Sequence, residues 1–233
     1  MRISVLLATS LLLAGCSTTA MQPHGQTTTP SASPASPTSS AVHSSAAPTT
    51  AAPPTAAPAA GADIGAVITW VEAGANTQAG GFHSATRDGA ATDLDGDIAF
   101  VTAEHTNCMT DKNFHGALAC LTHPKNPLPQ PADTFGHWVP GWVDFEGPTA
   151  EVGSVHGDPG RFDSGTGPQL QSGQSLAFGD YRCRPDAAGL ICVNYAHRTA
   201  VRFSDGGIET FGCLKPVIPP ADGFGQQFAC KAA

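Results

Sequence analysis

The chain has few charged and few aromatic side chains. Only 13% of its 233 residues are Asp, Glu, Lys or Arg, and only 7% are Phe, Trp or Tyr. Positive charge is the scarcer sign, with 11 Lys and Arg against 19 Asp and Glu. This shortage removes the usual electrostatic basis for binding nucleic acid or anionic headgroups. We therefore expect no nucleic-acid partner.

The sequence also lacks the common catalytic and cofactor motifs. It contains no phosphate-binding glycine loop, no dinucleotide fingerprint and no His-x-x-x-His or Cys-x-x-Cys pair. Residues 153–157 resemble the nucleophile elbow of serine hydrolases, but Val155 stands where that motif requires serine. We therefore expect no cofactor, no metal and no catalytic residue of a recognisable type.

No apolar run near the N-terminus is long enough to span a bilayer. The stretch from Ile3 to Leu13 follows the single basic residue Arg2 and has the length of a secretion signal. It ends in Leu13-Ala14-Gly15-Cys16, which resembles the bacterial lipobox. The alternative is an ordinary signal peptide followed by a chance cysteine.

The lipobox resemblance implies a lipid anchor on Cys16. In that family the thiol takes a diacylglyceryl group, the signal is cut just before the cysteine, and the freed amine is commonly acylated. Two or three acyl chains make a lasting anchor, whereas a single chain binds only marginally. We therefore expect residues 1–15 to be the signal peptide and the protein to be held on the extracytoplasmic face of the cell membrane through Cys16.

The remaining cysteines predict disulfides. Without Cys16, their number is even, and an even number outside the cytoplasm implies three disulfides. Six cysteines allow 15 connectivities, among which we predict nearest-neighbour pairing. A turn around Pro185, Asp186 and Gly189 would place the two flanking cysteines on opposed strand positions. The six cysteines are Cys108, Cys120, Cys183, Cys192, Cys213 and Cys230.

A spacer separates the anchor from the folded part. Residues 17–62 contain 13 Ala, 9 Thr, 8 Ser and 8 Pro, and no charged or aromatic residue. Such a composition buries too little apolar surface to offset the entropy of ordering, so we interpret residues 16–62 as the lipidated N-terminus and a disordered linker. A flexible coil of this length spans about 35 to 40 Å. Residues 63–233 are then one globular domain.

The sequence of residues 63–233 predicts a mainly β domain with one N-terminal helix. Asp63 is suited to cap a helix whose apolar residues recur at helical spacing before Gly74 ends it. From Gly80 onward, short β-prone runs alternate with turn dipeptides such as Asp88-Gly89. This pattern predicts a disulfide-stapled antiparallel sheet or sandwich, with only a minor helical part. The residues around Cys108 and Cys120 repeat the pattern around Cys183 and Cys192 with a longer loop, which further suggests two copies of one stapled hairpin.

Several segments resemble a mycobacterial lipoprotein of the LppI type. The resemblance covers the signal and most of residues 64–213, and it implies export and lipid anchoring. It brings no catalytic residues. Besides the lipobox, it is carried by residues 107–111, 116–121, 141–145, 178–184 and 192–197.

A few residues are candidates for binding. Trp138 and Trp142 flank a Pro-Gly turn, where exposed rings would stack on sugars or grip a partner and buried rings would belong to the core. His156 with Asp158 is a second candidate, because a carboxylate can orient an imidazole for proton transfer. The same holds for Asp111 with His115.

An acidic stretch and the histidines of the domain form two further patterns. Asp93, Asp95, Asp97 and Glu104 partly match a calcium loop, but Ile98 stands where that loop needs glycine, so we favour a solvated turn. The domain also has seven histidines. Their protonation would change the net charge of the cleaved chain from −9 to −2, which would weaken its repulsion from anionic surfaces in acid.

The function expected from these observations is a lipid-anchored module that binds or scaffolds an unknown ligand or protein partner in the cell envelope. The first alternative is an envelope hydrolase that uses His and Asp groups brought together by folding. The second is a carrier of an apolar ligand held between the sheet and the helix that follows Asp63.

Overall fold

The computed structural model describes residues 55–132, 134–156, 160–219 and 223–231 of the chain. The expected signal peptide, the expected lipidation site Cys16 and most of the expected spacer lie outside these ranges, as does Asp158. The described part consists mainly of β-strands, with one α-helix and three short 3₁₀-helices. The expectation of a mainly β domain with one helix is confirmed.

One sheet has six strands in the order β1-β9-β10-β11-β12-β13. All its pairs are antiparallel except that between β1 and β9, which is parallel. The strands are β1 (Ala75–Thr77), β9 (Gln174–Phe178), β10 (Tyr181–Asp186), β11 (Gly189–Asn194), β12 (Thr199–Ser204) and β13 (Gly207–Phe211).

A second sheet has seven strands in the order β14-β15-β8-β7-β6-β5-β4, and all its pairs are antiparallel. A separate hairpin joins β2 (Ser84–Arg87) to β3 (Ala90–Asp93). The seven strands are β14 (Lys215–Val217), β15 (Gln226–Ala229), β8 (Thr149–His156), β7 (His137–Phe145), β6 (Ala117–Leu121), β5 (Asn107–Asp111) and β4 (Ala99–Val101).

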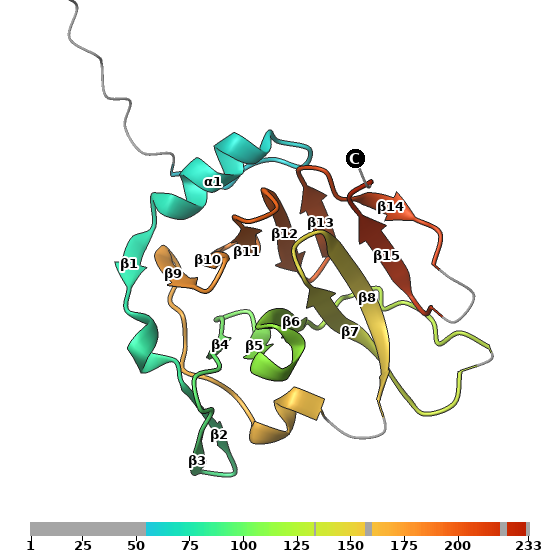
Figure 1. Cartoon of the computed structure of the whole chain (residues 1–233), viewed down its shortest axis with the longest axis horizontal. Coiled ribbons are helices and arrows are strands. Elements are labelled where there is room, and N and C mark those ends of the chain that lie inside the picture. Colours follow the sequence, from blue (N-terminus) through green and yellow to red (C-terminus); the bar gives the residue numbers. More distant parts are fainter. Residues whose placement is uncertain (1–54, 133, 157–159, 220–222, 232–233) are drawn as a thin grey trace, which may run out of the picture. The chain divides into compact units, whose positions relative to one another are not determined.

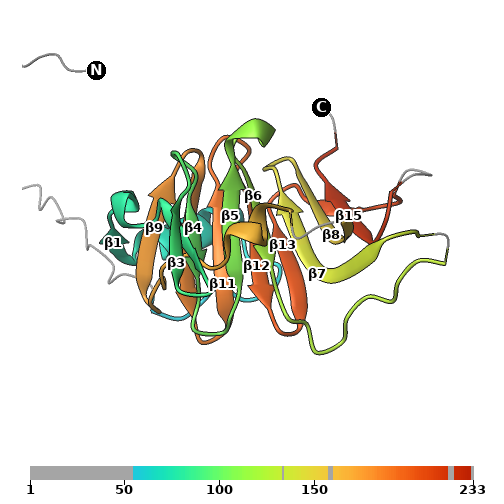
Figure 2. The ribbon, with the colours of Figure 1, turned by 90° about the horizontal axis from the view of Figure 1, so that it is seen from below.

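The two large sheets pack face to face, as Figures 1 and 2 show. The main core cluster draws side chains from both, among them Phe145 and Leu118 from one sheet and Phe203 and Leu190 from the other, all 0% exposed. Sandwich cores form in this way because alternate residues of each strand point to the inner face. The fold is therefore a β-sandwich.

The helix α1 (Ile64–Glu72) covers the outer face of the six-stranded sheet (Figure 1). It begins as expected, because the carboxylate of Asp63 accepts a hydrogen bond of 2.7 Å from the backbone N–H of Gly65. Its apolar side packs on β11, whose six residues are all buried because sheet and helix cover both faces of this strand. The resulting three layers are helix, sheet and sheet.

Side chains fill the space between the helix and the sheet. Trp70 and Val67 of α1 meet Ile191, Val193 and Phe211 of the sheet, and none of these is more than 2% exposed. The guanidinium of Arg184 lies 4.1 Å from the centre of the Trp70 ring. The interface proposed for an apolar ligand is thus occupied by the protein's own residues.

The last residues of the expected spacer contact the domain. The described chain starts at Thr55, and Ala57 is half-buried against the cluster under the helix. The carbonyl of Pro58 accepts a hydrogen bond from the guanidinium of Arg202. Ala57 and Pro58, which the sequence predicted to lie in the linker, therefore contact the domain.

The three disulfides join nearest neighbours, as predicted: Cys108 to Cys120, Cys183 to Cys192, and Cys213 to Cys230. The first two pairs occupy directly opposed strand positions, with Cα atoms 4.1 Å apart. All four of their cysteines are 0% exposed and lie in the core between the sheets. Each sheet thus has one cross-strand staple on its inner face.

The described residues include no helix that is both long and apolar enough to cross a membrane.

Candidate functional site

Neither tryptophan singled out from the sequence forms an exposed platform. Trp142 is 4% exposed, packs edge-on against Phe162 with ring centres 4.7 Å apart, and donates from Nε1 to Asp144 at 2.8 Å. Trp138 is half-buried and donates from Nε1 to the carbonyl of Leu128 at 3.0 Å. Trp142 is therefore a core residue, although it is also among the residues that line a cavity.

Of the two expected His–Asp pairs, only Asp111 with His115 lies wholly within the described residues. His156 lies in β8 opposite His137, while Asp158 falls outside the described residues. The carboxylate of Asp111 accepts a hydrogen bond of 2.8 Å from the backbone N–H of Asn113 and so caps the 3₁₀-helix η2 (Lys112–Phe114). It is not bonded to the imidazole of His115.

The partly matching calcium loop uses its carboxylates within the chain. Asp93 accepts from the backbone of Asp95, Asp95 pairs with Lys112, and Asp97 accepts from the hydroxyl of Thr110 at 2.8 Å. Among the described residues, no group of three or more His, Cys, Asp or Glu side chains is placed to hold a metal ion.

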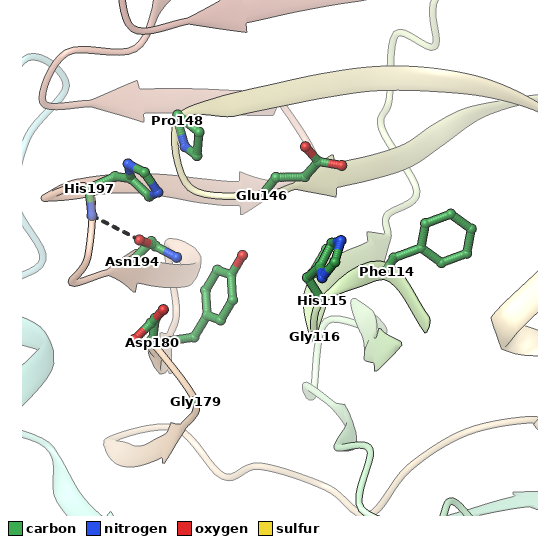
Figure 3. Close-up of a pocket in the computed structure, with 11 residues that line it drawn as sticks. Phe114, His115, Gly116, Glu146, Pro148, Gly179, Asp180, Asn194 and His197 are labelled. Atoms are coloured by element: carbon green, nitrogen blue, oxygen red, sulfur yellow. Dashed lines mark hydrogen bonds between the residues drawn. The ribbon is translucent and has the colours of Figure 1, made fainter. Parts of the chain in front are cut away.

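The structure instead brings four turns together at one end of the sandwich. They connect β5 to β6, β7 to β8, β9 to β10, and β11 to β12. Alternate turns of antiparallel strands lie at the same end, so residues far apart in the sequence meet there. Figure 3 shows His115 on one side, Asp180 and His197 on the other, and Glu146 above.

These turns enclose a cavity of about 430 Å³, which we call the central cleft. Its floor is Tyr181, whose hydroxyl donates to the carbonyl of Phe145 at 2.7 Å, and burial raises the pKa of this phenol. The side chain of Asn194 accepts from the backbone N–H of His197 at 3.1 Å, which fixes that turn. The polar lining residues are His115, Glu146, Asp180, Tyr181, Asn194 and His197.

An acidic cleft of about 530 Å³ adjoins the central cleft. Arg161 crosses it, donating to the carbonyl of Ala117 at 2.9 Å and lying 3.8 Å from the carboxylate of Asp144. Glu151 is directly opposite Asp144 on the neighbouring strand. Burial, and secondarily the charges of Asp144 and Glu146, raise the pKa of the Glu151 carboxyl. The charged lining residues are Asp111, Asp144, Glu146, Glu151 and Arg161.

A side cleft of about 520 Å³ lies on the other flank of the β5–β6 turn. There the ring Nδ1 of His83 donates to the carbonyl of Asp97 at 2.9 Å. The hydroxyl of Thr110 accepts from the backbone N–H of Ile98 at 2.9 Å. The polar lining residues are His83, Asp97, Thr110, Lys112, His115 and Tyr181.

The three clefts are lined by hydrogen-bonding side chains, and together these carry more negative than positive charge. Carboxylates accept, and amide and imidazole groups both donate and accept. An anionic ligand would be repelled by the carboxylates of the acidic cleft. The arrangement suits a neutral or cationic ligand rich in hydroxyl or amide groups.

Sequence reasoning did not identify most of this site. It named His115 as a candidate beside Asp111 and counted His197 only among the seven histidines of the domain, but it did not single out Glu146, Asp180 or Asn194. Their place relative to the predicted turns could have identified them, because each lies in or next to a turn at the same end of successive hairpins.

No family model, no curated protein and no solved structure matches the chain.

Proposed function

We propose that the protein is a lipoprotein of the LppI type, anchored through Cys16 on the outer face of the cell membrane, and that its domain binds a polar ligand in the central cleft. The observation that carries the binding proposal is the meeting of four turns around one cleft with six hydrogen-bonding side chains. The filled core and the filled helix interface support it, because within the described residues neither of them offers room for a ligand.

The anchor is tested by changing Cys16 to alanine in the full-length protein. We expect the wild type to incorporate labelled palmitate and to fractionate with membranes, and the variant to do neither, because alanine has no thiol to take the diacylglyceryl group that would hold the protein on the membrane. Equal labelling, or unchanged fractionation of the variant, would contradict the anchor and with it the proposed location.

The binding site is tested by native mass spectrometry of the full-length protein extracted from envelopes in mild detergent. We expect the wild type to retain a ligand mass, and the double variant Asp180→Ala, His197→Ala to lose at least about 90% of it. That loss corresponds to roughly 1.4 kcal/mol or more of binding free energy.

A matched control uses the opposite end of the sandwich. His123 and Asp205 line a separate cavity of about 220 Å³ there, so changing both to alanine removes the same two residue types. This control should retain the ligand as the wild type does. The binding proposal would be contradicted if the wild type retained no ligand, or if the Asp180→Ala, His197→Ala variant retained as much ligand as the wild type.

The hydrolase is a second candidate, because His115, His197 and Asp180 do meet at one cleft. Within the described part of the chain, however, neither imidazole is hydrogen-bonded to a carboxylate, which is how such groups are usually oriented for proton transfer. The same mass spectra separate the two functions, since an enzyme would release a cleaved product after incubation and a binding module would return its ligand intact.

A further inference from the structure

The three clefts form one continuous groove around the tip of the β5–β6 turn. The side cleft and the central cleft share His115, Gly116, Gly179 and Tyr181 as lining residues. The central and acidic clefts share Phe114, Ala117 and Glu146. A ligand in one cleft can therefore extend into the next without leaving the surface.

Two glycines lie where the side cleft meets the central cleft, a junction that we call the crossing, and they leave it unobstructed. Gly116 and Gly179 have positive φ angles of 73° and 47°, and a Cβ placed on either would have no atom within 4 Å. The absence of side chains here thus leaves open space above the backbone. A larger residue at either position would divide the groove.

The second crossing offers an aromatic surface. Phe114 lies between the central and acidic clefts and is 60% exposed, with the guanidinium of Arg161 5.7 Å from its ring centre. An exposed ring in a polar groove can pack against the apolar face of a sugar while neighbouring carboxylates and amides bond its hydroxyls.

The walls of the groove indicate which kind of chain fits. An extended polypeptide usually binds by adding a strand to a sheet edge, where main-chain hydrogen bonds supply the affinity. Here the walls of the central cleft are turns of both sheets and not an edge strand, and six of the lining residues have polar side chains. Hydroxyl groups, which donate and accept, match such a mixed lining along its whole length.

We propose that the ligand is a linear glycan, neutral or amine-bearing, whose successive sugars occupy the side, central and acidic clefts and cross over Gly116 and Gly179. This inference rests on the proposed binding function and names its ligand class.

The test compares short and long glycans on the full-length protein in detergent. The probes are chitin fragments of two and six sugars, with their deacetylated, amine-bearing counterparts, measured by calorimetry. We expect the six-sugar probe to bind wild type at least about tenfold more tightly than the two-sugar probe, because it fills more subsites.

The variants Gly116→Asn and Gly179→Asn should abolish this length dependence. Asparagine tolerates a positive φ better than other side chains, so the turn is kept while the crossing is filled. The two affinities should then agree within about threefold. Gly89→Asn is the control, because Gly89 has a φ of 82° and open space around it but lies in the β2–β3 turn.

A surface variant covers the case in which the asparagine variants do not fold. Phe114→Ala should weaken the six-sugar probe about tenfold without lowering the melting temperature. A length-independent affinity in the wild type would overturn the extended groove. Binding of a basic peptide with no glycan binding would overturn the ligand class. Either result leaves the proposed binding function intact if native mass spectra still show a retained ligand. A wild-type protein that retains no ligand would contradict both the glycan proposal and the proposed binding function.

Discussion

Replacing Cys183 and Cys192 together by alanine is expected to lower the free energy of unfolding by about 3–5 kcal/mol. The disulfide closes a loop of nine residues, which restricts the unfolded chain. Both sulfurs are also fully buried between the sheets, so their removal leaves a cavity in the core. A loss of this size is a large fraction of the 5–15 kcal/mol that is typical of a domain. Denaturant unfolding without reductant measures it.

The Cys213–Cys230 pair separates the two causes. It closes a longer loop of 17 residues, but Cys213 is exposed and lies outside the core. Chain entropy alone would make its removal the more damaging of the two. We expect the reverse, with a loss of about 1–3 kcal/mol. An equal or larger loss than that for Cys183 and Cys192 would show that burial of the sulfurs contributes little.

Changing Gly189 to alanine is expected to destabilise the protein by at least about 3 kcal/mol. Gly189 begins β11 with a φ of 121°, a conformation that L side chains rarely adopt. A Cβ there would lie 2.2 Å from the carbonyl oxygen of Phe203 on the neighbouring strand. Because the obstacle is backbone in the middle of a sheet, relief requires moving β11 away from β12. Thermal or denaturant unfolding would measure the change.

Gly89→Ala is the matched control. Gly89 also has a positive φ, 82°, but a Cβ there meets no atom within 4 Å. Backbone strain alone should therefore cost about 1 kcal/mol. If the two substitutions cost the same, the close approach to Phe203 would have no energetic weight and the strain in φ would account for both.

The parts of the fold that the sequence predicted are the local ones. The helix follows from Asp63 as a cap and from apolar residues at helical spacing, both within about ten residues. The pairing of Cys183 with Cys192 follows from the turn between them, which sets the register of the hairpin. In each case the interacting residues are close in the chain, so the pattern itself carries the information.

The order of the strands was not predictable in the same way. β15 pairs with β8 although Gln226 and Val152 are 74 positions apart, and β1 pairs with β9 although Ala75 and Gln174 are 99 apart. Such pairings depend on which surfaces remain to be buried once the hairpins have formed. The candidate site has the same origin, because its turns meet only after both sheets pack.

The strands at the edges of the sheets have a consequence for self-association. Of the four strands at the ends of the two large sheets, β1, β4 and β14 are only three residues long, whereas β13 has five. β14 also contains Pro216, which has no backbone N–H to donate. Edge strands this short offer a neighbouring molecule few backbone N–H and C=O groups with which to pair. These three edges are thereby protected against fibre-like stacking, even where many copies crowd together.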